Sequence, residues 1–148
     1  MGNRGFKRGL VHLIPVEWLW PIEGHDRIHQ QELQEKILAE GVWDTPIVVE
    51  RERWLVLDGM HRFESALRLG LGLIPAVLVS YDEDPISVHC KQTGHELFIA
   101  NILHNARMGS QYPKHTCVHT LPEGVREATC HHPLWTLMNV SAMKRISP

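Results

Sequence analysis

Cysteine is scarce in this chain, and the three cysteines that are present form no pattern. Cys90, Cys117 and Cys130 are an odd number and include no C-x-x-C pair. An odd set without close spacing excludes a disulfide framework and a standard zinc ribbon. We therefore expect a reducing, cytoplasmic environment for the protein.

An excess of one charge and long apolar runs are also lacking. The 15 basic side chains oppose 17 acidic ones, for a net charge of −2. Such a balance provides no overall attraction to polyanions, so a nucleic-acid partner is disfavoured. No apolar stretch approaches the length of a membrane span, so we expect no membrane partner. The 148 residues have room for one domain with a real core, and they do not indicate an oligomeric state.

Apolar periodicity predicts a small α+β domain. Runs rich in β-branched residues predict a strand within 11–19, a hairpin formed by 46–50 and 54–57, and a strand over 74–79. Helical spacing predicts helices over 30–40 and 61–69, and each is followed by a glycine that ends it. The order strand, helix, hairpin, helix, strand fits a small mixed β-sheet with packed helices.

The pattern weakens after residue 85. A short strand over 86–89 and a helix over 95–106, between Gly94 and Gly109, are the elements that the residues favour. Residues 111–132 are rich in His, Thr, Pro and Gly, which predicts a loop with at most short strands.

The segment Asp58-Gly59-Met60-His61-Arg62 is the most informative motif. A predicted strand ends there and a predicted helix begins, so unpaired backbone N–H groups and the positive end of the helix dipole point to one place. That place favours phosphate, because Gly59 lets the backbone approach closely while His61 and Arg62 add donors. The alternative is that Asp58 only caps the helix and Gly59 only makes the turn.

This turn and its neighbouring strands, over 13–81, resemble the ParB/sulfiredoxin-like fold. Within that fold the segment is most similar to the free L-serine kinases, whose hallmark at the turn is Asp-Gly-His-His-Arg. Met60 replaces the first histidine. Sulfiredoxins carry a reactive cysteine in the slot of Met60, and methionine cannot perform thiolate chemistry. ParB partition proteins carry Gly-Glu-Arg-Arg there and need a helix-turn-helix domain, for which this chain leaves little space.

The resemblance implies a phosphotransferase that uses ATP or ADP with Mg²⁺ to phosphorylate free L-serine to O-phospho-L-serine. The nucleotide phosphates would be bound by the turn itself, that is by Asp58, Gly59, Met60, His61 and Arg62. Asp58 would also hold Mg²⁺, which prefers one or two carboxylates together with phosphate oxygens. The resemblance further implies two parts of one compact unit, namely a nucleotide-phosphate-binding core over 1–85 and an appended helix with a substrate-side tail over 86–148.

A serine hydroxyl needs a proton acceptor during phosphoryl transfer. In the resembling kinases an acidic residue directly after a histidine, shortly before the first helix, is assigned this role, and Asp26 follows His25 at the corresponding place. Asp26 is therefore the first candidate for the base, Glu23 is the second, and Asp58 is able to share the role. The alternative is that Asp26 only caps the helix that follows.

A third segment, residues 112–119, resembles the Pro-Pro-Lys-x-Thr-Arg-His run with which these kinases hold the amino-acid carboxylate. Lys114, Thr116 and His119 offer the donors for that role. The usual arginine is missing, and one extra residue separates Pro113 from His119.

Two other functions remain open from the sequence. One is a ParB-like nucleotide-binding module without turnover that acts in regulation or in DNA-linked processes. The other is a degenerate relative kept for protein interaction, which would bind no nucleotide. Serine-dependent release of nucleoside diphosphate or monophosphate would indicate the kinase, and binding of CTP or DNA without release would indicate the module. A chain that binds no nucleotide would indicate the degenerate relative.

Overall fold

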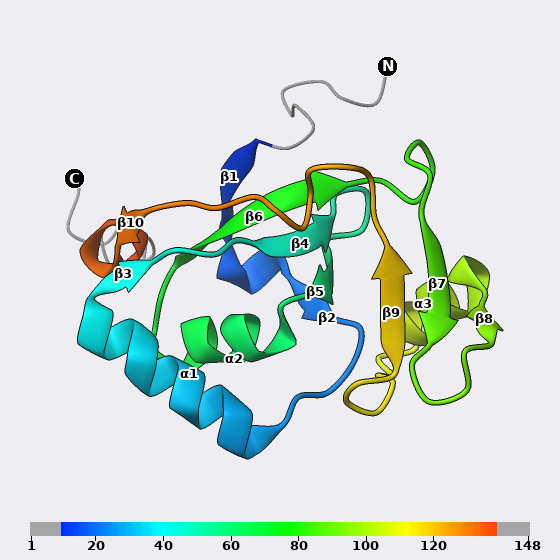
Figure 1. Ribbon diagram of the computed structural model, residues 1–148, viewed down its shortest axis with the longest axis horizontal. Coiled ribbons are helices and arrows are strands. Elements are labelled where there is room, and N and C mark those ends of the chain that lie inside the picture. Colours follow the sequence, from blue (N-terminus) through cyan, green and yellow to red (C-terminus); the bar gives the residue numbers. More distant parts are fainter. Residues whose placement is uncertain (1–9, 139–148) are drawn as a thin grey trace.

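The computed structural model describes residues 10–138, and it has the α+β architecture with a mixed sheet that the sequence predicts (Figure 1). The helices and strands are, in chain order, β1 (Val11–Pro15), β2 (Trp20–Pro21), α1 (Arg27–Glu40), β3 (Val42–Trp43), β4 (Ile47–Glu50), β5 (Leu55–Asp58), α2 (Met60–Arg68), β6 (Leu73–Val79), β7 (Ser87–Cys90), β8 (Glu96–Leu97), α3 (Ile99–Arg107), β9 (Cys117–Thr120) and β10 (His132–Pro133). Two 3-10 helices, Val16–Trp18 and Leu134–Leu137, complete the set. No helix within residues 10–138 is long and apolar enough to cross a membrane.

The main sheet has five strands in the order β1-β6-β4-β5-β2. β4 and β5 form the predicted antiparallel hairpin, β1 pairs with β6 antiparallel, and the β4–β6 and β2–β5 pairs are parallel. α1 and α2 lie against each other on one side of this sheet, and α2 contacts β4 and β5 (Figure 1). The strand expected within 11–19 ends at Pro15, where the 3-10 helix Val16–Trp18 begins.

The two ends of α1 follow from local chemistry. Asp26 caps the N-terminus, since its side chain accepts the N–H of His29, and the helix therefore begins at Arg27, three residues before the predicted start. Gly41 closes the other end in the left-handed conformation, at φ 69°. Asp26 thus caps the helix, which places its carboxylate at the open N-terminal end of α1.

A second sheet of three strands, in the order β8-β7-β9, stands beside α3. The predicted strand over 86–89 is observed as β7, and the loop predicted over 111–132 contains the short strand β9 and ends at the first residue of β10. The helix predicted from residue 95 begins instead at Ile99. Glu96 and Leu97 pair with β7, so the chain stays extended there before the helix begins.

After β9 the chain runs back across the molecule to β10, which pairs with β3 next to the end of α1 (Figure 1). The backbone N–H of Cys130 donates to the Asp44 carbonyl at 3.1 Å, and that of Leu134 donates to the Gly41 carbonyl at 3.1 Å. Residues 121–131 therefore form a tethered strap between the small sheet and α1.

The core is centred on β4, whose four residues are all buried. Its last residue, Glu50, is a buried acid whose carboxylate accepts the backbone N–H groups of Arg53 at 2.8 Å and Tyr81 at 3.0 Å. Burial raises the pKa of Glu50, and the guanidinium of Arg53 at 3.3 Å supplies an opposite charge. This network joins the β4–β5 hairpin to the end of β6.

Candidate active site

The turn between β5 and α2 has the shape of an anion site. Gly59 adopts φ 94°, and a Cβ at this position would lie 2.6 Å from Cγ2 of Ile47, so only glycine fits. The first bond inside α2 runs from the N–H of Phe63 to the carbonyl of Gly59 at 2.9 Å. The three preceding N–H groups, those of Met60, His61 and Arg62, thus have no acceptor within the helix and lie at its positive end. Such an end binds phosphate readily.

Met60 takes part in this turn only through its backbone. Its side chain is 7% exposed and belongs to the hydrophobic core. The predicted nucleotide-binding set included Met60, and the structure restricts its contact to the N–H group.

Asp58 and Arg62 border one hollow of about 240 Å³, which extends from the turn to the strap. A guanidinium nitrogen of Arg62 lies 3.6 Å from a carboxylate oxygen of Asp44. Asp58 Oδ2 accepts a hydrogen bond from Nη1 of Arg126 at 2.7 Å. Both cations that flank the turn are therefore paired with carboxylates.

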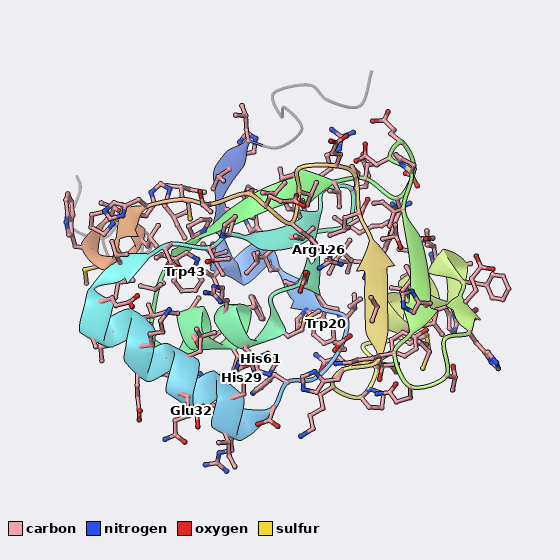
Figure 2. All side chains as sticks on the ribbon, in the orientation of Figure 1. Trp20, His29, Glu32, Trp43, His61 and Arg126 are labelled. Carbon is pink, nitrogen blue, oxygen red and sulfur yellow. The ribbon has the colours of Figure 1, made fainter. Side chains whose placement is uncertain are left out.

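His61 faces the other side of the turn, where a hollow of about 190 Å³ is lined by α1, Glu23 and the turn. Its Nε2 accepts the backbone N–H of Asp26 at 3.0 Å, so the proton of the neutral ring lies on Nδ1. The ring centroids of His29, His115 and His25 lie 4.3, 5.6 and 6.3 Å from that of His61. Figure 2 shows His29 and His61 close together, between the start of α1 and α2.

The environment keeps His61 neutral. Burial lowers the pKa of His61 to about 4, and the neighbouring imidazoles of His29, His115 and His25 add to this effect. At neutral pH the ring is therefore a hydrogen-bonding group without charge. By accepting the N–H of Asp26 through Nε2 it joins the turn after β5 to the N-terminus of α1.

Asp26 and Lys114 meet at this point. Oδ2 of Asp26 accepts a hydrogen bond from Nζ of Lys114 at 3.2 Å, and Oδ1 accepts the N–H of His29 at 3.0 Å. The bond from the His29 N–H and the Lys114 ammonium lower the pKa of Asp26 to about 2. The tail thus reaches the start of α1, and a carboxylate that is ionised across the whole physiological range lies next to the turn after β5.

Glu23 holds the tail in place. It is 8% exposed, and its two carboxylate oxygens accept the backbone N–H groups of His115 at 2.7 Å and Cys117 at 3.0 Å. The backbone of Tyr112 adds two bonds, since it donates to the Ile22 carbonyl and accepts from the Gly24 N–H, both at 2.9 Å. Burial raises the pKa of Glu23, while the backbone bonds act in the opposite direction.

Both carboxylate oxygens of Glu23 are therefore occupied by backbone N–H groups of the tail. A carboxylate whose two oxygens both accept backbone N–H groups is poorly placed to take a proton from a substrate. Glu23 was the second candidate for the base, and its geometry favours fixing the loop that carries Lys114 and Thr116. The Thr116 hydroxyl donates to the Pro113 carbonyl at 2.6 Å, and the residue is half-buried in the same turn.

His119 lies away from this hollow. Its side chain is 3% exposed, and Nε2 lies 2.7 Å from the hydroxyl of Tyr81. Burial lowers the pKa of His119 to about 4, with a smaller contribution from Arg126. Alternate residues of β9 face opposite sides, so the extra residue noted in the motif turns the histidine to the buried face. The structure thus brings Lys114 to the site and leaves His119 inside the protein.

A magnesium ion at this turn would have to take most of its ligands from phosphate oxygens and water. Within residues 10–138 no three His, Cys, Asp or Glu side chains come together in a group that could hold a metal. Asp58, half exposed beside the turn, offers one carboxylate, which fits an ion that takes its other ligands from phosphate oxygens and water. The donor set at the turn is therefore compatible with Mg²⁺ bound together with nucleotide.

The sequence interpretation did not include Arg126. It lies in the strap, 68 residues from Asp58, in a segment without a recognised motif. Nothing in the local pattern indicates its place, because the strap is positioned by β9 on one side and by the β3–β10 pair on the other. Figure 2 shows Arg126 above α2, between β4 and β9.

No family model matches the chain. An ATP-dependent L-serine kinase of Staphylothermus marinus is 35% identical over 80 residues, which cover 51% of this chain and 32% of that protein. A ParB-like protein of Sulfolobus acidocaldarius is 31% identical over 77 residues, which cover 49% of this chain and 39% of that protein. The matched segment thus spans about a third of the length of these curated relatives.

Solved structures match over much more of the chain. A free serine kinase in complex with AMP superimposes with a TM-score of 0.77 at 12% identity, over 89% of this chain and 95% of that chain. SbnI of Staphylococcus aureus with a C-terminal truncation gives a TM-score of 0.72 at 13% identity, over 92% of each chain. At these identities the match shows the fold. The resemblance drawn from the turn and its neighbouring strands, to a ParB/sulfiredoxin-like fold close to free serine kinases, is confirmed.

Proposed function

We propose that this chain, whose fold is that of free serine kinase structures, phosphorylates free L-serine with ATP or ADP and Mg²⁺ to give O-phospho-L-serine. One observation carries the proposal. Lys114 lies 3.2 Å from the Asp26 carboxylate, and the N–H of Asp26 donates to His61 at 3.0 Å. The tail motif, the start of α1 and the phosphate-binding turn therefore meet at one point.

The proposed division of labour follows the two parts of the chain. Residues 1–85 bind the nucleotide, with the N-terminus of α2 and Arg62 at the phosphates and Asp58 at Mg²⁺. Residues 86–148 supply the amino-acid side, where the Lys114 ammonium and the Thr116 hydroxyl are donors for the serine carboxylate. We further propose a cytoplasmic setting, in which the three free cysteines stay reduced and the product enters amino-acid metabolism.

Asp26 is the proposed proton acceptor. With a pKa of about 2 it is a weak base, so it does not remove the hydroxyl proton before the reaction. Phosphoryl transfer with a loose transition state forms little bond to the nucleophile early, so the hydroxyl becomes acidic only late in the step. A permanently ionised carboxylate that orients the hydroxyl and receives its proton late satisfies this requirement.

The test uses variants that keep the helix cap. Asn and Ser cap helices about as well as Asp, so Asp26→Asn and Asp26→Ser are expected to leave the fold intact. Release of the nucleotide product with and without L-serine is measured for each variant, and nucleotide affinity is measured by calorimetry. We expect serine-dependent release to fall by about 100-fold or more while nucleotide affinity stays within about twofold. Full activity of either variant would remove Asp26 from the mechanism.

A second candidate is a ParB-like nucleotide-binding module without turnover. It is favoured by the similarity to the ParB-like protein of Sulfolobus acidocaldarius and by the low pKa of Asp26. The same assay separates the two functions. Serine-dependent release supports the kinase, whereas binding of CTP or DNA without release supports the module, and a chain that binds no nucleotide at all would leave only the protein-interaction hypothesis.

A further inference from the structure

The backbone of Arg126 is anchored beside the turn after β5. Its neighbour Val125 is 2% exposed and anchors the strap in the core, while the N–H of Val125 donates to the Pro122 carbonyl at 3.3 Å. Nη1 of Arg126 donates to Asp58 Oδ2 at 2.7 Å, and Nη2 donates to the His119 carbonyl. The backbone is therefore anchored, and the guanidinium is aimed at the turn.

The hollow beside the turn has a cation on each side. Arg62 borders it from α2, and Arg126 borders it from the strap, with Thr45, Pro46 and Val48 between them. In the structure each guanidinium is paired with an aspartate, Arg62 with Asp44 and Arg126 with Asp58. At about 240 Å³ the hollow is smaller than the pockets that enclose a typical drug-sized ligand, and its size fits phosphate groups.

The guanidinium of Arg126 can exchange the Asp58 carboxylate for another anion. The two side chains are 48% and 47% exposed, and exposed ion pairs contribute little to stability. A phosphate offers the planar guanidinium two oxygens and more negative charge than one carboxylate. Entry of a phosphate chain would therefore draw Arg126 away from Asp58 at small cost, and the released carboxylate would become free for a cation.

We propose that Arg126 is a nucleotide-binding residue that contacts a second phosphate, next to the one at the N-terminus of α2. In the absence of nucleotide the Arg126 guanidinium is paired with the Asp58 carboxylate. When a phosphate binds, the guanidinium moves from the carboxylate to the ligand, and Asp58 becomes free for Mg²⁺. Nucleotide and Mg²⁺ thereby favour each other's binding, because each removes a partner of the resting ion pair. This inference rests on the nucleotide-binding part of the proposed function.

The test compares Arg126→Gln with wild type by calorimetry, using AMP, ADP and ADP with Mg²⁺, without serine. We expect Arg126→Gln to weaken ADP binding at least tenfold and AMP binding less than twofold, because AMP has no second phosphate. Arg107→Gln is the matched control, since it removes the same charge from an exposed position on α3. Arg126→Lys keeps the charge but loses the planar guanidinium that can donate two parallel hydrogen bonds, so its ADP affinity should lie between those of wild type and Arg126→Gln.

A double-mutant cycle tests the exchange itself. Asp58→Asn releases Arg126, so ADP without Mg²⁺ should bind at least threefold more tightly than to wild type. This gain should be lost when Arg126→Gln is also present. An equal gain in both backgrounds means that Asp58 only repels the phosphates, and it would overturn the exchange.

The outcomes also separate this inference from the kinase assignment. If ADP affinity depends on Arg126 and no serine-dependent turnover occurs, the kinase proposal fails and Arg126 keeps its role. If wild type phosphorylates serine and Arg126→Gln binds ADP as wild type does, the inference fails alone. A wild-type chain that binds neither AMP nor ADP would overturn the inference as well.

Discussion

Replacement of Glu23 by glutamine tests how the amino-acid side of the site is built. Glu23→Gln keeps the shape of the side chain, but the carboxamide has one acceptor oxygen where the carboxylate has two. It can accept either the N–H of His115 or that of Cys117, and its NH₂ group then faces the other N–H. The variant therefore loses one charge-assisted bond in a buried place and leaves one backbone donor without an acceptor.

The magnitude follows from this loss. A hydrogen bond to a charged group contributes about 1.5–3 kcal/mol, so the free energy that keeps residues 114–117 in place should fall by about that amount. Since 1.4 kcal/mol corresponds to about a tenfold change in an equilibrium constant, KM for L-serine should rise roughly tenfold or more. Nucleotide affinity should remain unchanged, because the turn after β5 does not depend on these bonds.

Two measurements check this prediction. Amide hydrogen exchange at His115 and Cys117 should accelerate in Glu23→Gln, and steady-state kinetics should show the change mainly in KM. Glu32→Gln is the matched control, because Glu32 is exposed on α1 and the substitution is the same (Figure 2). A Glu23→Gln enzyme with unchanged exchange and KM but a greatly reduced kcat would refute the positioning role and make Glu23 the base.

Two further predictions concern stability. Gly59→Ala should lower the free energy of unfolding, measured by urea denaturation, by about 2 kcal/mol or more, because its Cβ would lie 2.6 Å from Ile47 Cγ2 and φ is positive. Gly41→Ala is the control: φ is also positive there, but no atom lies within 4 Å of the added Cβ, so the cost should be only about 1 kcal/mol. His119 has a pKa of about 4 when folded, against about 6.5 unfolded, so its contribution is fully present above pH 6.5 and is lost as the pH falls towards 4. The loss reaches at most about 3 kcal/mol, and His119→Gln should reduce it; an unchanged pH dependence in that variant would contradict the assignment.

Much of the fold could be predicted because the decisive signals are local. The β-branched runs on either side of Arg51-Glu52-Arg53 predict the β4–β5 hairpin, and Gly41 ends α1 where the periodicity stops. The strand-turn-helix at Asp58-Gly59 is predictable for the same reason, since these residues are adjacent to the helix that follows them. In these cases the physical cause of the structure lies within a few residues.

The features that could not be predicted depend on distant contacts or on small differences in register. α3 begins later than its periodicity indicates, because Glu96 and Leu97 pair with β7. The role of Arg126 depends on the path of the strap, and the burial of His119 depends on one additional residue before a strand. Glu23 carries no local sign that both its oxygens accept N–H groups from a loop 92 and 94 residues away.

The pairing of Asp26 with Lys114 has a consequence for the order in which the molecule assembles. These two residues are 88 positions apart, whereas the turn after β5 forms within a hairpin and the helix that follows it. Closing a long loop costs entropy before its contacts are formed, and contacts between distant residues form late in folding. We therefore expect the contact between the tail and the start of α1 to form after the turn, so that the two sides of the site come together late in folding.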